Sequence, residues 1–80
     1  MKQIKLLYFA QLGAQAGNAE ESLSTELDSL EALFDDRKTA HGWDLSVKNI
    51  RFARNDDFCS ASDRFHDGDV IAFMPPMSGG

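Results

Sequence analysis

The chain has 80 residues, of which 42% are apolar and 26% charged, a composition typical of one small globular domain. A chain this short has little room for an enclosed active site, so we expect any chemistry to be shared with a partner. The net charge is −5 and the basic residues are scattered, which disfavours binding to nucleic acid. No apolar run approaches the roughly 20 residues that span a bilayer, which disfavours membrane insertion.

The single cysteine, Cys59, excludes an intrachain disulfide and a cysteine-rich metal site. We therefore expect a reducing cytoplasm as the location and interpret Cys59 as a packed or half-exposed structural thiol. His41 and His66 have no neighbours at metal-ligand spacing, so we interpret both as surface histidines. No metal site is predicted.

The first part of the chain predicts a β-hairpin. Every second residue from Ile4 to Tyr8 is apolar, and the intervening positions, which end at Phe9, are partly apolar as well. Residues 13–17 read as a loop or a single helical turn between two glycines. The polar segment Glu20–Thr25 is a short strand that we expect to pair with the first.

A helix is predicted over residues 29–41. Asp28 or Ser29 can cap its N-terminus, and Gly42 offers a C-terminal stop. Its apolar stripe consists of Leu30, Leu33 and Phe34. We expect Trp43, which follows, to belong to the core.

Three further strands complete the pattern. One covers Ile50–Ala53, a turn at 55–57 leads to a short return strand at Phe58–Cys59, and a turn at 67–69 leads to the apolar strand Val70–Met74. One helix and a buried first strand favour an α+β fold, with a mixed sheet of four to five strands and the helix packed across it. The first and last strands can lie side by side and parallel, which is the β-grasp arrangement.

The C-terminal end is the most distinctive segment. We predict a domain over residues 1–74 and an extended tail over residues 75–80, which read Pro-Pro-Met-Ser-Gly-Gly. The two prolines stop the strand ladder, and four further residues reach about 13 Å. The last two residues have no side chain, so the tail can thread a narrow channel and present the carboxylate of Gly80 to a reactive centre. Joining a carboxylate to AMP gives it a good leaving group, and a sulfur nucleophile can then form a thiocarboxylate.

Three segments, KQIKLLYFAQ (Lys2–Gln11), Leu30–Leu33 and DGDVIAFMPPMSGG (Asp67–Gly80), resemble the ubiquitin-like MoaD/ThiS family of sulfur carriers, above all molybdopterin synthase small subunits of the MoaD type. The resemblance implies a ubiquitin-like β-grasp fold. It also implies adenylation of Gly80 by an E1-like, MoeB-like enzyme that uses ATP, and sulfuration with sulfur from a donor such as a cysteine desulfurase or a rhodanese. No stably bound cofactor is implied.

The resemblance further implies that the tail inserts into a MoaE-like large subunit, which holds most of the active site. Sulfur would pass there to cyclic pyranopterin monophosphate and form the dithiolene of molybdopterin, in a heterotetramer with two small subunits. Gly80 would carry the adenylate and then the sulfur, and Gly79 would keep the channel clear. The inserted arm would consist of Pro75, Pro76, Met77 and Ser78.

Strand alternation places Phe9 and Met74 on the sheet face away from the helix, so we interpret them as hydrophobic docking residues. Relatives often have an Arg-Glu pair where this chain has Gly13-Ala14, and Arg51 and Arg54 are candidates to replace it, although solvated strand arginines are the simpler interpretation. Three alternatives stay open: a ThiS-like carrier for thiamine or another pathway, a ubiquitin-like modifier of protein lysines, and a pure interaction module.

Overall fold

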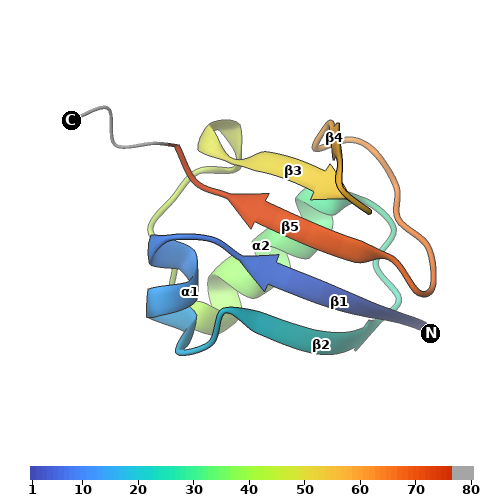
Figure 1. The fold of residues 1–80 in the computed structure, drawn as a ribbon, viewed down its shortest axis with the longest axis horizontal. Helices are drawn as coiled ribbons and strands as arrows, with labels where there is room; N and C mark the ends of the chain where they lie inside the picture. Colours follow the sequence, from blue (N-terminus) through green and yellow to red (C-terminus); the bar gives the residue numbers. More distant parts are fainter. Residues whose placement is uncertain (77–80) are drawn as a thin grey trace.

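The computed structural model describes residues 1–76, and Figure 1 shows one sheet with a single main helix across one of its faces. The predicted α+β class and mixed sheet are confirmed. The elements are, in chain order, β1 (Lys2–Tyr8), α1 (Gln11–Ala16), β2 (Glu20–Thr25), α2 (Leu30–His41), a 3₁₀ turn (Val47–Asn49), β3 (Arg51–Arg54), β4 (Asp57–Cys59) and β5 (Val70–Met74).

The sheet has β1 and β5 as neighbours at its centre. Its strand order is β2-β1-β5-β3-β4. β1 runs parallel to β5, with Leu6 opposite Ile71, and antiparallel to β2. β3 runs antiparallel to β5, with Phe52 opposite Phe73. The predicted parallel pairing of the first and last strands and the predicted hairpin are therefore confirmed, and the arrangement is a β-grasp.

The core fills the space between α2 and the sheet. Its largest fully buried side chains are Leu6, Leu12, Leu30, Leu33, Phe34, Phe65, Ile71 and Phe73. Burial of each such side chain stabilises the fold by roughly 1.5–3 kcal/mol. The predicted stripe of α2 lies wholly within this set.

Helix α2 begins and ends where its capping residues predict. The Ser29 hydroxyl accepts the backbone N–H of Ala32 at 3.2 Å, so residue 29 is the cap and the helix proper begins one residue later. Gly42 adopts a left-handed φ of 70° and donates its N–H to the carbonyl of Lys38, which ends the helix after His41. Within residues 1–76, no helix has the length and apolar character to cross a membrane.

Trp43 belongs to the core, as predicted, with 3% of its surface exposed. Its indole Nε1–H donates to the carbonyl of Leu12 at 3.1 Å, so the buried donor is satisfied. Its ring stacks on Phe34 with 5.7 Å between centroids and meets Tyr8 edge-on at 5.0 Å. Trp43 thereby ties α1 to α2 and to the end of β1.

The predicted loop or single turn at 13–17 is wrong in extent, because α1 begins at Gln11 and contains the fully buried Leu12. A helix this short buries one residue and therefore gives no periodic signal. Gly13 permits the close packing: a Cβ atom there would lie 2.9 Å from the carbonyl oxygen of Tyr8. The absence of a side chain thus lets α1 approach the end of β1.

The turn between β3 and β4 is shorter than the predicted 55–57. Asn55 and Asp56 have positive φ values of 53° and 74°, which is typical of a two-residue hairpin turn. Asp57 pairs with Arg54 and is already the first residue of β4. This pairing fixes which face each β4 side chain occupies.

Candidate functional site

The C-terminal segment follows β5, the middle strand of the sheet. β5 ends at Met74, and Pro75 and Pro76 follow, the first partly buried and the second exposed. Neither proline has an N–H to extend the ladder, which explains why pairing stops here. The remaining predicted tail residues, including the predicted reactive carboxylate, lie outside the described residues: Met77, Ser78, Gly79 and Gly80.

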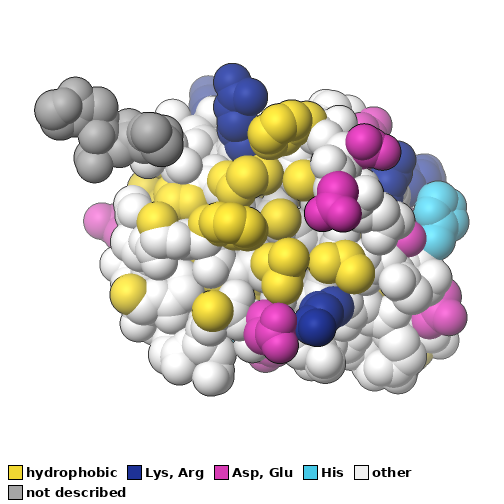
Figure 2. All heavy atoms as spheres, viewed as in Figure 1, with side chains coloured by type: hydrophobic (Ala, Val, Ile, Leu, Met, Phe, Trp, Pro, Cys, Tyr) yellow, Lys and Arg dark blue, Asp and Glu magenta, His cyan; other side chains and the backbone are white. Residues whose placement is uncertain are grey.

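The sheet face opposite α2 is apolar near this point, and Figure 2 shows hydrophobic side chains gathered over it. Phe9 is 48% exposed and Phe58 is 69% exposed. Met74 is partly buried. A patch of this kind on a small domain marks an interaction surface more often than chance exposure. Its smaller neighbours are Leu7, Ala53, Val70 and Ala72.

A groove of about 510 Å³ runs from this patch to the root of the tail. The residues that line it are Phe9, Ala10, Gln11, Arg51, Phe58, Met74, Pro75 and Pro76. The structure therefore brings the two predicted docking residues together with both described prolines of the predicted arm. A protein that covers this groove also lies against the first residues of the tail.

The backbone explains why Phe9 and Met74 meet. The N–H of Phe9 donates to the carbonyl of Phe73 at 3.2 Å, so the parallel ladder continues one residue beyond Tyr8. Side chains one position further along each strand then point to the outer face together. Their role in docking stays a prediction.

Phe58 is a candidate docking residue that the sequence reasoning missed. β4 has three residues, too few to show an alternation. The hairpin register places Phe58 opposite Ala53, and Ala53 follows the buried Phe52, so Phe58 shares the outer face with Ala53. The two-residue turn at Asn55 and Asp56 was the signal that could have identified it.

Arg51 borders the groove and lies over Phe58. Its guanidinium carbon is 5.7 Å from the centroid of the Phe58 ring, a cation–π arrangement. Arg54 makes a structural contact instead. Its guanidinium donates to the backbone carbonyl of Arg64 and so connects the segment between β4 and β5 to β3. Of the two arginines that we considered as replacements for the missing Arg-Glu pair, Arg51 is therefore the one on the groove.

Gly13 and Ala14 occupy the place of that pair, on α1. A side chain at residue 13 has to displace the backbone of Tyr8, as the 2.9 Å distance shows. Helix α1 in this chain thus packs closely against β1 and presents no charged group at residues 13 and 14.

A polar cluster lies outside the groove, at the open edge of the sheet beside α2. One oxygen of Glu21 accepts the hydroxyl of Tyr8 at 2.5 Å and lies 3.1 Å from Nε2 of His41. The other oxygen accepts from Arg37 at 3.1 Å. His41 is partly buried in this cluster, so its interpretation as a surface histidine is wrong: the contact spans 20 residues, and local sequence does not reveal it.

The cluster shifts two pKa values. Partial burial raises the pKa of Glu21, but hydrogen bonds from Tyr8 and His41 and the charge of Arg37 together outweigh it, and the net pKa lies below the ordinary 4.5. Burial and the adjacent Glu21 carboxylate raise the pKa of Tyr8, which stays protonated at neutral pH. The arrangement binds β2 to α2 and offers no reactive group.

Cys59 is partly buried, as expected, and burial raises the pKa of its thiol. A thiol that resists ionisation is a poor nucleophile. His66 is exposed, with 3.9 Å between its Nδ1 and Asp69. In the part of the chain that the structure describes, no group of three or more His, Cys, Asp or Glu side chains is placed to hold a metal ion.

The fold defines a class. A five-stranded sheet with parallel central strands and one main helix across one face is the architecture of ubiquitin-like β-grasp proteins.

Comparison of the sequence with known families narrows the assignment from this fold class to one family. The profile of the ThiS family matches residues 6–80, and the chain belongs to this family. Molybdopterin synthase sulfur carrier subunits from Chlamydomonas reinhardtii and Escherichia coli (strain K12) are 35% and 30% identical to it, over 98% and 96% of this chain and 99% of each relative. The family resemblance of the three sequence segments is thereby confirmed.

Solved structures agree on the fold. The small archaeal modifier protein 1 of H. volcanii superimposes with a TM-score of 0.80 at 21% identity, over 96% of this chain and all of that chain. A chain from the complex of subunits 1 and 2 of the molybdopterin-converting factor of Helicobacter pylori superimposes with a TM-score of 0.66 at 20% identity, over 98% of this chain and 99% of that one. The ubiquitin-like β-grasp is confirmed.

Proposed function

We propose that this protein is a sulfur carrier and the small subunit of a molybdopterin synthase. The observation that carries the proposal is the apolar groove at the root of the Pro-Pro-Met-Ser-Gly-Gly tail. It offers a docking surface beside the first residues of the tail, so a partner docked there can also receive the tail. The names of the two relatives point to the same function.

In this proposal Gly80 is the working residue. An E1-like, MoeB-like enzyme joins its carboxylate to AMP from ATP and releases pyrophosphate. The persulfide of a cysteine desulfurase or rhodanese then displaces AMP and forms an acyl disulfide. A second thiol of the donor protein cleaves the sulfur–sulfur bond, which leaves a thiocarboxylate on Gly80 and a disulfide on the donor. No stably bound cofactor takes part on this chain, and we place the reaction in a reducing cytoplasm, in keeping with a single cysteine.

The second half of the reaction takes place on a partner. A MoaE-like large subunit covers the groove, and Phe9, Phe58 and Met74 provide the apolar contact. Pro75 and Pro76 stiffen the start of the arm that enters its active site. The thiocarboxylate gives its sulfur to cyclic pyranopterin monophosphate in a heterotetramer. The Helicobacter pylori structure, a complex of subunits 1 and 2, supports the pairing of a small subunit with a large one.

Intact-mass spectrometry with fragmentation tests the proposal directly. The protein is incubated with ATP, an E1-like activating enzyme and a sulfur donor, and then mixed with the large subunit and cyclic pyranopterin monophosphate. We expect an oxygen-to-sulfur mass gain confined to Gly80, followed by its loss as molybdopterin forms. A reaction without ATP and a variant that lacks Gly80 are the controls.

Three results decide against the proposal. A terminus that stays unmodified under these conditions removes the carrier function. Conjugates to protein lysines through Gly80, without any thiocarboxylate, identify a modifier instead. A thiocarboxylate that the large subunit does not consume, but a thiazole-forming system does, assigns the carrier to thiamine synthesis.

A further inference from the structure

We propose that Arg51, held against the ring of Phe58, selects the partner by pairing with a carboxylate on the surface that covers the groove. The inference rests on the proposed function, because the partner in question is the subunit that receives the tail. It adds the chemistry of the partner's contact surface: an apolar anchor residue for the groove and an aspartate or glutamate beside it.

The position of Arg51 is the first argument. It lies on β3 directly opposite Met74, the last residue before the tail, and it is exposed. Its guanidinium carbon lies 5.7 Å from the Phe58 centroid, on the neighbouring strand. A planar guanidinium can stack on an aromatic ring and still direct its N–H groups outward, which a lysine ammonium does less well. Arg51 is thus oriented at the groove rim before any partner arrives.

Charge is the second argument. Three other cationic side chains are each paired with a carboxylate of this chain: Lys2 with Asp28, Lys5 with Glu20 and Arg37 with Glu21. Within residues 1–76, Arg51 makes no such ion pair, and neither do Lys38, Lys48, Arg54 and Arg64. Arg51 differs from these four because it lines the groove, where no acidic residue lies, although Asp56 lines the adjoining hollow. The neighbours of Arg51 in the groove are apolar side chains and Gln11.

These two facts determine what the partner must offer. A protein that buries the apolar groove also removes water from Arg51. A cation that loses its water without gaining an acceptor costs several kcal/mol, whereas a carboxylate in the fork of the guanidinium offsets that cost. A carboxylate facing residue 51 therefore separates the correct partner from other apolar surfaces.

Arg51 is also relevant to the Arg-Glu pair that this chain lacks on α1. Gly13 leaves no room there for a charged side chain, since a Cβ would lie 2.9 Å from the Tyr8 carbonyl oxygen. In this proposal Arg51 on β3 provides the charged contact that residues 13 and 14 of α1 do not offer.

Affinity measurements with the large subunit of the same organism test the inference. Arg51→Gln keeps a polar, though shorter, side chain and removes the charge, and we expect about tenfold weaker binding, with a smaller dependence on salt concentration. Lys5→Gln is the matched control, because Lys5 is exposed on the same strand face as Leu7 but does not line the groove. It is expected to bind like the wild type.

Zero-length cross-linking identifies the partner group. In Arg51→Lys the new amine stands where the guanidinium was, and a carbodiimide joins an amine to a carboxylate only in direct contact. We expect one cross-link between residue 51 and an aspartate or glutamate of the large subunit, located by peptide mass spectrometry. Substitution of that acid by its amide then weakens the wild-type complex as much as Arg51→Gln does.

The outcomes separate the two proposals. If the wild type forms the thiocarboxylate and binds the large subunit, but Arg51→Gln binds equally well, the role of Arg51 is wrong and the proposed function stands. If the wild type does not bind the large subunit, both fail. A dimer of this chain that Arg51→Gln dissociates assigns the groove to a second copy and overturns the inference as well.

Discussion

Leu6 of β1 lies directly opposite Ile71 of β5 in the parallel pair, and both side chains are completely buried. Parallel strands in register end on the same side of a sheet. This pairing therefore places Phe9, after the end of β1, beside Met74, at the end of β5. The most buried contact in the sheet thus determines that the exposed groove and the root of the tail coincide.

Removal of Gly80 is expected to abolish sulfur transfer without loss of stability. The buried hydrophobic residues of the described structure all lie between Ile4 and Phe73, so a change at position 80 leaves them untouched. Thermal melts of the full chain and of the truncated chain should agree, while the truncated chain forms no molybdopterin. Equal melts together with normal molybdopterin synthesis would contradict the assignment of Gly80.

Phe9→Lys and Met74→Lys are expected to weaken binding of the large subunit more than they weaken the fold. Phe9 is 48% exposed, so a lysine there can keep its ammonium in water. A loss of at least about tenfold in affinity is typical of an interface anchor. Binding and thermal unfolding are measured on the same samples. A large fall in Tm with unchanged affinity would show that these residues are part of the core.

Two phenylalanines provide a sharper contrast. Phe58 is 69% exposed on the outer face, and Phe65 is 1% exposed in the core. Phe58→Leu should leave the free energy of unfolding within about 0.5 kcal/mol of the wild type but weaken binding. Phe65→Leu should cost about 1–1.5 kcal/mol of stability and leave binding of the folded protein intact. Urea unfolding and calorimetric titration separate the two effects, and the opposite pattern would remove Phe58 from the docking surface.

The strong periodic signals in the sequence predicted the frame of the fold correctly. Alternation in β1 and β5, the stripe of α2 and its cap at Ser29 all reflect local rules that act within a few residues. Two elements are too short to show a periodic pattern of apolar residues, so the sequence did not predict their extent or orientation. They are α1, with its buried Leu12, and β4, with Phe58. Their orientation depends on partners elsewhere in the chain.

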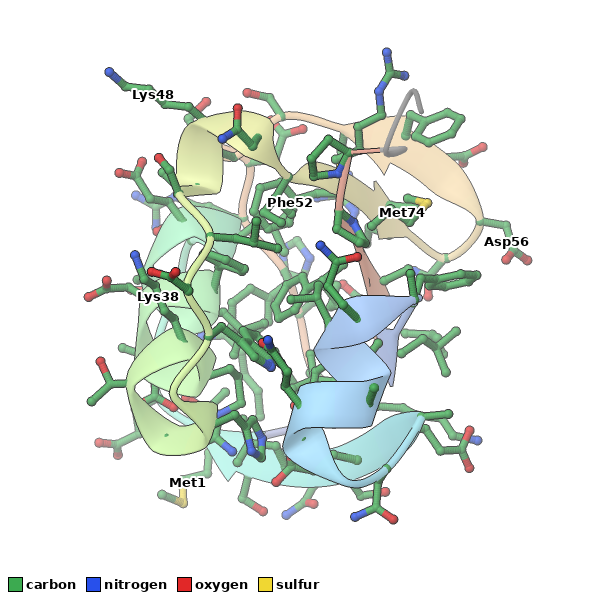
Figure 3. The ribbon with its side chains drawn as sticks, turned by 90° about the vertical axis from the view of Figure 1, so that its left-hand side faces the viewer. Met1, Lys38, Lys48, Phe52, Asp56 and Met74 are labelled. Carbon is green, nitrogen blue, oxygen red and sulfur yellow. The ribbon has the colours of Figure 1, made fainter. Side chains whose placement is uncertain are left out.

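In the candidate site, too, the residues in periodic strands could be predicted from the sequence, and those that depend on distant contacts could not. Phe9 and Met74 could be predicted because each belongs to a strand with a readable inner and outer face. The cation–π contact of Arg51 depends on the register of the β3–β4 hairpin, and the contact of His41 with Glu21 joins residues 20 positions apart. Contacts of this kind become visible only when the sheet order is known. Figure 3 shows the Met74 side chain beside β3, whose first residue, Arg51, lies opposite Met74.

Gly13→Ala is expected to destabilise the protein although alanine favours helices. The new Cβ would lie 2.9 Å from the Tyr8 carbonyl oxygen, a backbone atom that cannot move alone. Overpacking of this kind costs about 1–3 kcal/mol, against a gain of about 1 kcal/mol in helix propensity. We therefore expect a net loss of about 1 kcal/mol in urea unfolding. The exposed neighbour provides a control, since Ala14→Ser should cost about 0.5 kcal/mol or less; a Gly13→Ala variant more stable than the wild type would refute the packing argument.

Stability is expected to fall in acid partly because of Glu21. Partial burial opposes its ionisation, but Tyr8, His41 and Arg37 together hold its pKa below 4.5 in the folded protein. A lowered folded-state pKa means that the ionised carboxylate stabilises the fold above the unfolded-state pKa. This contribution is lost as the pH falls through the folded-state pKa.

Glu21→Gln tests this dependence. The variant should be less stable than the wild type at neutral pH, and the difference in unfolding free energy should shrink as the pH falls into the acid range. Glu20→Gln is the matched control, because Glu20 makes an exposed pair with Lys5 at 3.6 Å, and pairs of this kind contribute little. Urea unfolding across this pH range measures both variants. A difference between wild type and Glu21→Gln that stays constant in acid would mean that the Glu21 contacts act through packing and not through the charge.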